Sequence, residues 1–144
     1  MKRIICMLTV LFAAVPIADA EEVDTRTVIQ LSPQHRALVL GEMRQFLAGL
    51  QQMTHALSRD DMGTVSREAR SLGVSMSHHM PAELKQALPL EFRKMGHSVH
   101  SSFDQIALDA ESLGDGQHTL SQLGDTLSRC VSCHSAYQIR EIKN

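Results

Sequence analysis

The sequence predicts an all-α fold, an antiparallel up-down-up-down four-helix bundle. Apolar residues recur at spacings of three and four in four stretches of similar length, which is the pattern of amphipathic helices. The links between these stretches are short, which favours antiparallel neighbours. Aromatic residues make up only 3% of the chain and Trp is absent. A core made from Leu, Met, Val and Ala suits helices better than a β-sandwich.

The first helix is expected over about residues 33–58, with Ser32 as N-cap and Pro33 at the first helical position. One apolar stripe comprises Leu40, Met43, Leu47, Leu50 and Leu57, and a second comprises Val39, Phe46 and Met53. The second stripe exceeds what one helical seam requires. It therefore predicts a contact with a second copy, and so a possible homodimer.

Three further helices are expected, over about residues 62–79, 90–113 and 118–142. Gly73 lies inside the first of these and would allow close approach of another helix or of a bound group. The helix over 90–113 has a heptad stripe, and the last helix has an apolar seam. These stripes are Phe92, Val99, Ile106 and Leu113, followed by Leu120, Leu123, Leu127 and Val131.

The N-terminus has the features of a secretory signal peptide, residues 1–20. A basic start and an apolar core precede Ala18-Asp19-Ala20, so cleavage is expected after Ala20. The apolar run is too short for a stable membrane anchor, although an uncleaved membrane helix is the alternative. We expect a periplasmic protein with a polar, extended or frayed leader (21–32) and a helical domain (33–144). The net charge of −2 gives no reason to expect nucleic acid as a partner.

The last helix carries Cys130-Val131-Ser132-Cys133-His134, a C-x-x-C-H motif of the kind that attaches haem covalently. Residues three apart share a helix face, so both thiols can add to the vinyl groups of one porphyrin. The adjacent His134 can then bind the iron as an axial ligand. The motif predicts one covalent haem c.

Two other interpretations of the cysteine pair are weaker. A redox-active disulfide of the thioredoxin kind expects a βαβ context, and none is predicted. A structural zinc site needs about four ligands, and the chain has no second cysteine pair. A haem-free thiol protein remains a rival function for Cys130 and Cys133.

With this motif in the last of four helices, the chain resembles the class II c-type cytochromes, the cytochrome c prime family. The resemblance implies a haem within the bundle, with its distal face against the first helix. It also implies a propionate contact for Arg36 and dimerisation through the first two helices. Relatives commonly have an arginine four residues after the haem histidine. Gln138 occupies that position here, and Arg140 is the nearest arginine.

The sequence leaves three possibilities for the residue that faces the iron on the side opposite His134. Met43 could bind the iron as a sixth ligand, or Leu40 could leave an apolar distal face and a five-coordinate iron; another ligand is also possible. His97 and His100 share a helix face and could bind a metal, but solvent-facing histidines are the simpler interpretation.

The favoured function is electron transfer by a periplasmic mono-haem cytochrome, with redox proteins as partners. The alternative is a five-coordinate binder of diatomic gas such as nitric oxide or carbon monoxide. Enzyme activity, of the peroxidase or nitric oxide reductase kind, is not expected because no distal acid-base pair is assigned by the sequence. No catalytic residue is therefore predicted.

Overall fold

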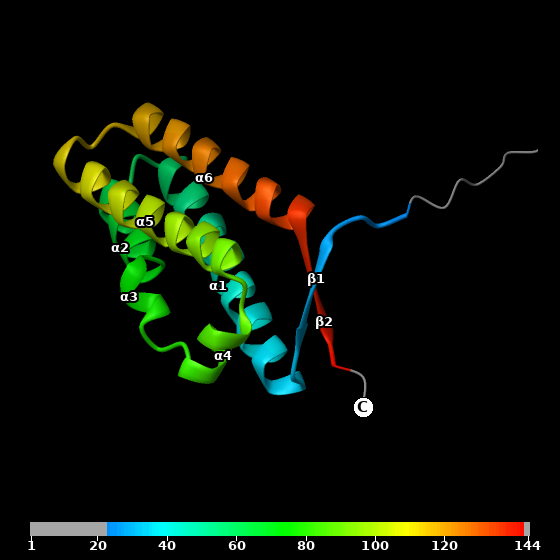
Figure 1. The fold of residues 1–144 in the computed structure, drawn as a ribbon. Coiled ribbons are helices and arrows are strands. Elements are labelled where there is room, and N and C mark those ends of the chain that lie inside the picture. Colours follow the sequence, from blue (N-terminus) through cyan, green and yellow to red (C-terminus); the bar gives the residue numbers. More distant parts are fainter. Residues whose placement is uncertain (1–22, 143–144) are drawn as a thin grey trace, which may run out of the picture.

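A computed structural model describes residues 23–142 of the chain, and this part is predominantly helical, as the sequence predicts (Figure 1). The expected signal peptide, its cleavage site and Cys6 lie outside the described residues. The elements are β1 (Thr27–Leu31), α1 (Pro33–Leu57), α2 (Met62–Ser71), α3 (Val74–Ser77), α4 (Ala82–Ala87), α5 (Leu90–Ser112), α6 (Gly116–Ala136) and β2 (Tyr137–Glu141). Among residues 23–142, no helix has the length and apolar character needed to cross a membrane.

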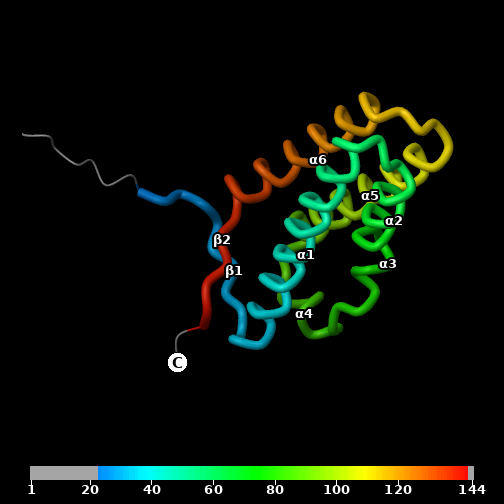
Figure 2. Tube along the Cα trace, turned by 180° about the vertical axis from the view of Figure 1, so that it is seen from behind, coloured from blue at the N-terminus to red at the C-terminus, as the bar shows by residue number. Residues whose placement is uncertain are grey.

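The helices pack in sequence order around one main core. α1 packs on α2, α2 packs on α5, and α5 packs on α6. Figures 1 and 2 both show α6 diverging from α1 as it approaches the two strands. The closely packed end of the helical body is therefore the one away from the strands. Its fully buried side chains include Met53, Val65, Phe103 and Ile106.

The first helix begins as predicted, because the Ser32 side chain accepts a hydrogen bond from the His35 amide and Pro33 follows. Its buried residues include Val39, Phe46 and Met53, which belong to the stripe assigned above to a dimer contact. That assignment is wrong, because these side chains are covered within the chain itself. Leu47, from the stripe expected to face the core, is instead 69% exposed.

The second predicted helix is interrupted. α2 ends at Ser71, and the short α3 begins after Gly73. A Cβ at Gly73 would collide with the side chain of Asp104 on α5, so glycine allows the close approach predicted for this position. The Asp104 carboxylate accepts a hydrogen bond from the Val74 amide at 2.9 Å, which fixes the break against α5.

A two-stranded parallel sheet joins the two ends of the described chain, and the sequence did not predict it. β1 pairs with β2, with Thr27 opposite Tyr137. Ile29 and Leu31 alternate with exposed residues and are buried, so this part of the expected leader belongs to the fold. The last helix consequently ends at Ala136 and not near residue 142. Strand pairing outweighs helical propensity in this short segment.

The apolar stripes of the last two long helices are only partly as predicted. Val99 and Ile106 of α5 are buried, Phe92 is half-buried, and Leu113 is 61% exposed. On α6, the buried residues are Thr119, Leu123 and Thr126. The other three members of the expected α6 seam, Leu120, Leu127 and Val131, are 47–66% exposed. The buried face of α6 is therefore rotated from the predicted seam, and it continues to the two cysteines.

Candidate cofactor site

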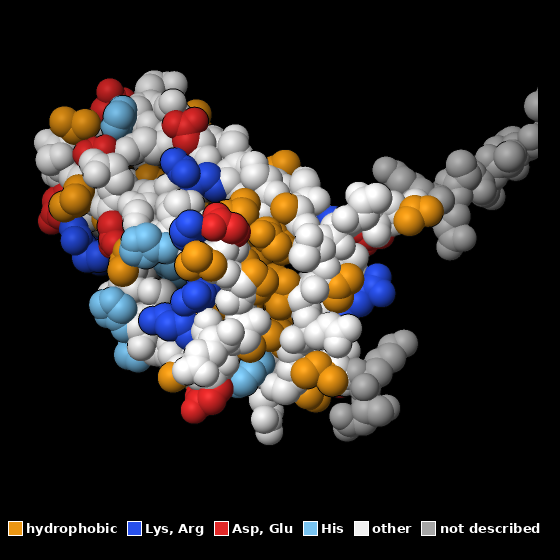
Figure 3. Space-filling view, viewed as in Figure 1, with side chains coloured by type: hydrophobic (Ala, Val, Ile, Leu, Met, Phe, Trp, Pro, Cys, Tyr) orange, Lys and Arg blue, Asp and Glu red, His pale blue; other side chains and the backbone are white. Residues whose placement is uncertain are grey.

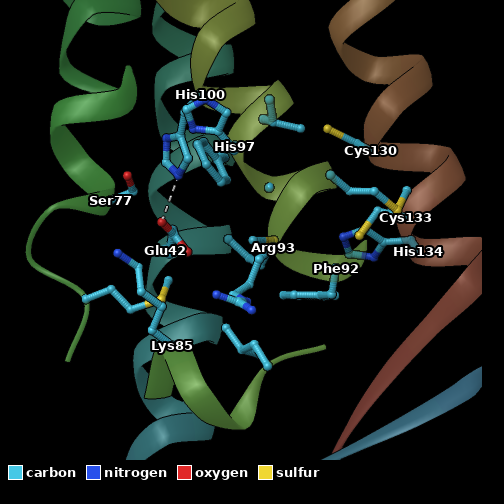
Figure 4. Close-up of a pocket in the computed structure, with 17 residues that line it drawn as sticks. Glu42, Ser77, Lys85, Phe92, Arg93, His97, His100, Cys130, Cys133 and His134 are labelled. Atoms are coloured by element: carbon cyan, nitrogen blue, oxygen red, sulfur yellow. Dashed lines mark hydrogen bonds and ion pairs between the residues drawn. The ribbon is translucent and has the colours of Figure 1, made fainter. Parts of the chain in front are cut away.

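The C-x-x-C-H motif occupies the last turns of α6. Cys130 and Cys133 are unpaired and half-buried. Both lie on the face that points from α6 towards α5, while His134 is exposed beside them. Figure 4 shows the two cysteine side chains and His134 entering one cavity from α6. The helix therefore presents two sulfurs and one imidazole to the same space, as the motif predicts.

Two adjoining cavities meet at this motif. The first has a volume of about 270 Å³ and lies between α1, α5 and α6. The second has a volume of about 410 Å³ and extends to β2. Both are lined by Met43, Phe92, Cys133 and His134. Ligand pockets are typically roughly 300–1,000 Å³, so the two spaces together suit one sizeable molecule.

The first cavity has a largely apolar wall. Three methionines and four other apolar side chains form it: Met43, Met80 and Met95, with Phe46, Leu88, Phe92 and Val99. Figure 3 shows hydrophobic side chains gathered in the region between α5 and the end of α6. Such a wall excludes water and favours an apolar, polarisable ligand.

Gly96 marks a gap in α5 at the cavity. A Cβ built on Gly96 meets no atom within 4 Å, although this glycine lines the cavity beside the cysteines. By contrast, a Cβ at Gly49, elsewhere in the core, would come within 2.5 Å of Leu72 Cδ1. The helix surface at Gly96 is thus open where a flat ring would have to pass between α5 and α6. The donor set, the apolar wall and this gap together fit a haem.

The two thiols are kept in their neutral form. Burial raises the pKa of the Cys130 thiol. Burial, and then the neighbouring Cys130, raise the pKa of Cys133. The motif also lies near the C-terminus of α6, where the helix dipole disfavours a thiolate. Reactive redox cysteines generally have lowered pKa values at helix N-termini, so this environment does not favour a disulfide oxidoreductase.

His100 is buried, which corrects the interpretation of this residue as solvent-facing. Its Nδ1 lies 2.7 Å from the Leu72 carbonyl oxygen, and its Nε2 lies 3.1 Å from Glu42 Oε1. A carbonyl only accepts, so Nδ1 carries a proton. Burial opposes the charged ring, but the hydrogen bonds to Glu42 and Leu72 outweigh it and raise the pKa of His100.

The alternative considered for His97 and His100, a shared metal site, is not supported by the geometry. Both ring nitrogens of His100 are engaged by protein groups, whereas His97 is exposed at the cavity. Within residues 23–142, no group of three or more His, Cys, Asp or Glu side chains is arranged to hold a metal ion.

The first-helix candidates occupy different places. Met43 lines both cavities, and Leu40 lines only the second. Arg36 is half-buried on the first turns of α1 and is not among the residues that line either cavity. The structure therefore brings Met43 and Leu40 to the motif but does not bring Arg36 there.

Three positively charged side chains at the cavities, Lys85, Arg93 and Arg26, were not identified from the sequence, and Arg140 was noted only as the nearest arginine after His134. Lys85 and Arg93 line the first cavity, and Arg26 and Arg140 line the second. Arg26 Nη1 also donates a hydrogen bond to the His134 carbonyl oxygen at 3.3 Å. No motif links these residues to the cysteines. Only the fold of α4, α5 and the two strands brings them to the site.

Comparison with known proteins adds no relative: no family model, no curated protein and no solved structure matches this chain.

Proposed function

We propose that this chain is an exported mono-haem c-type cytochrome, related to the cytochrome c prime family, that transfers electrons. In this proposal Cys130 and Cys133 hold one haem c through thioether bonds, and His134 is an axial ligand of its iron. The observation that carries the proposal is the placement of two free, half-buried thiols and an adjacent imidazole at one apolar cavity. A chance occurrence of the C-x-x-C-H spacing would not require a cavity beside it.

The proposal extends to the architecture. α1, α2, α5 and α6 would form the antiparallel four-helix bundle, with α6 spread from α1 at one end to admit the cofactor. The strand pair β1–β2 would hold that end together, because it fastens the segment after His134 to the segment before α1. A four-helix bundle is the architecture that the resemblance implies, and the spread end would give the cofactor its place within it.

The haem would supply the one-electron chemistry, and the protein would set its potential and its access to small molecules. Cys130 and Cys133 would anchor the haem and fix its orientation. Phe46, Phe92 and Val99 exclude water from the cavity wall. A low-polarity wall disfavours added positive charge, so it favours the reduced state. No catalytic residue is assigned, because the ring nitrogens of buried His100 are already engaged.

Met43 is the proposed sixth ligand. It shares with His134 the property of lining both cavities, so the two side chains flank the same space from α1 and α6. A thioether opposite an imidazole closes the iron to small ligands and raises the potential. This arrangement suits electron transfer to partner proteins.

A gas-binding cytochrome is the second candidate function. It is favoured by Leu40, which lines the second cavity together with Met43 and His134. If Leu40 and not Met43 covers the iron, the iron stays five-coordinate and open to nitric oxide or carbon monoxide.

The attachment is tested by exporting the full chain in a bacterium that has the cytochrome c maturation machinery. We expect a pyridine haemochrome typical of thioether-linked haem and retention of haem in denaturing electrophoresis. A Cys130→Ser/Cys133→Ser variant is the matched control and should retain none. A wild-type chain that also retains none would contradict the proposal.

The ligand is tested by adding carbon monoxide to the reduced protein. With Met43 bound, the wild type should resist carbon monoxide and a Met43→Leu variant should bind it at once. Met95→Leu is the control, because Met95 lines only the first cavity and the change nearly conserves volume. Immediate binding by the wild type would instead support the five-coordinate alternative.

A further inference from the structure

The first cavity has an uncompensated positive charge. Lys85 and Arg93 line it, and the one acidic residue in its wall, Glu42, faces buried His100. Neither basic side chain forms an ion pair or a side-chain hydrogen bond in the described part of the chain. By contrast, Lys94, next to Arg93, pairs with Glu91 at 2.8 Å. The cavity therefore offers two cations to an anionic group.

These two cations are held by a rigid corner of the fold. Lys85 lies in α4, and Arg93 lies in the first turns of α5, where its amide donates to the Pro89 carbonyl oxygen. Leu84 and Leu88 fix the α4–α5 corner, because both are buried in a cluster with Ile29, Leu31 and Val39. The side chains are exposed at their ends, but their backbone positions are set by buried packing.

The cations also lie away from the thiols. Figure 4 shows Cys130 and Cys133 entering from α6, with Lys85 on the opposite side of the cavity and Arg93 between them. Haem has its two vinyl groups on one edge and its two propionates on the opposite edge. If the vinyl edge is bonded to the thiols, the carboxylates point away from α6.

We propose that Lys85 and Arg93 form a carboxylate-binding site that holds the propionates of the haem. The inference rests on the proposed function. The guanidinium of Arg93 has the planar fork that binds a carboxylate through two hydrogen bonds, and the ammonium of Lys85 acts as a compact point charge. Their role is positioning and electrostatic, because they stabilise the cofactor's carboxylates and not its iron.

The two arginines that line the second cavity already have partners. Arg26 pairs with Asp24 at 2.7 Å, and Arg140 Nε donates to Gln138 Oε1 at 2.7 Å. Arg36, the propionate contact expected by resemblance, is not among the residues lining either cavity. Lys85 and Arg93 are therefore the better partners for the carboxylates.

The test is a redox titration of the haem-loaded protein at low ionic strength. Positive charge near the haem favours the ferrous state, so Lys85→Gln/Arg93→Gln should shift the equilibrium towards ferric iron by about tenfold. For one electron, tenfold corresponds to about 59 mV lower potential. Each single variant should give part of this shift, and Arg93→Lys should stay within about twofold of the wild type, because it keeps the charge.

Lys94→Gln is the matched control. It removes the same charge from the same turn of α5, but outside the cavity and from an exposed ion pair. Its shift should stay below about twofold, because exposed charges are screened. If the double variant moves the potential no more than Lys94→Gln does, the propionate assignment is wrong although haem attachment stands. If the wild type carries no haem, the proposed function fails first, and this assignment with it.

Discussion

The two ends of the helical body differ in how completely they are filled, and two glycines show the difference. At Gly73, at the junction of α2 and α3, a Cβ would collide with Asp104. At Gly96, on the same side of the body but beside the thiols, a Cβ would meet nothing within 4 Å. Phe103 and Ile106 of α5 are fully buried, whereas one turn or two earlier the same helix lines a cavity.

This difference indicates that the cavity beside the thiols is a local feature of one end and not a sign of loose packing throughout the helices. Protein interiors are normally close-packed, with few voids larger than a water molecule. Met53, Val65 and Phe103 are completely packed, whereas a largely apolar cavity is left beside Cys130 and Cys133, the two thiols of the C-x-x-C-H motif. The difference between the filled core and this cavity thus supports the proposal that a cofactor occupies the space beside the thiols.

The largest expected effect lies at the packed end. Phe103→Ala should lower the free energy of unfolding by about 3–5 kcal/mol, because it leaves a cavity in a filled core. Phe92→Ala, at the hollow end, should cost less than half as much when both cysteines are replaced by serine, since Phe92 is only half-buried. Urea unfolding measures both. Equal losses of unfolding free energy in the two variants would contradict the proposed difference in packing between the two ends.

The next effect lies at the boundary between the ends, where the His100 ring packs at a tilt against Phe46 with ring centroids 5.1 Å apart. The raised pKa of His100 means that its charged form contributes stability below its unfolded pKa of about 6.5. This contribution is lost as pH rises through the folded pKa. His100→Gln should therefore lower stability by about 1–3 kcal/mol in mild acid and flatten its decline towards alkaline pH.

Urea titrations at about pH 5.5 and about pH 8.5 test this dependence, on either side of the ordinary histidine pKa. His55→Gln is the control, because His55 is exposed on α1. If the wild type and His100→Gln lose stability in parallel as pH rises, the charged form of His100 is not stabilised by Glu42 as described.

The smallest effects should have opposite signs. Gly73→Ala should destabilise by about 1 kcal/mol, because Asp104 must move and release the Val74 amide. Gly96→Ala in the chain with both cysteines replaced by serine should stabilise by about 0.5–1 kcal/mol, since alanine favours a helix interior and meets no neighbour. Thermal unfolding compares them. A destabilising Gly96→Ala would show that the gap at Gly96 is filled by protein atoms.

The helical class and the cysteine motif could be predicted because their signals are local. Ser32 and Pro33 mark the start of α1, and Cys130, Cys133 and His134 are adjacent in one helix. The rotation of α6 could not be predicted, because Leu127 and Thr126 are neighbours and only tertiary packing decides which is buried. Thr126 can face the core because its hydroxyl donates a hydrogen bond to the Gln122 carbonyl oxygen and is therefore not left unpaired.

The parallel strand pair and the cations depended on long-range contacts. Thr27 and Tyr137 are far apart in the sequence, and no short turn between the strands indicates that they pair. Likewise, Lys85 and Arg93 line the same cavity as the motif only because α4 and α5 meet at a buried corner. His100 was misassigned because its partners come from other parts of the chain, Glu42 from α1 and Leu72 from the end of α2.

Mass spectrometry of the exported protein tests the central claim most directly. The account predicts the polypeptide plus one haem, with the added mass on the peptide that contains Cys130, Cys133 and His134. A bare polypeptide, with both thiols free or joined to each other, would contradict it.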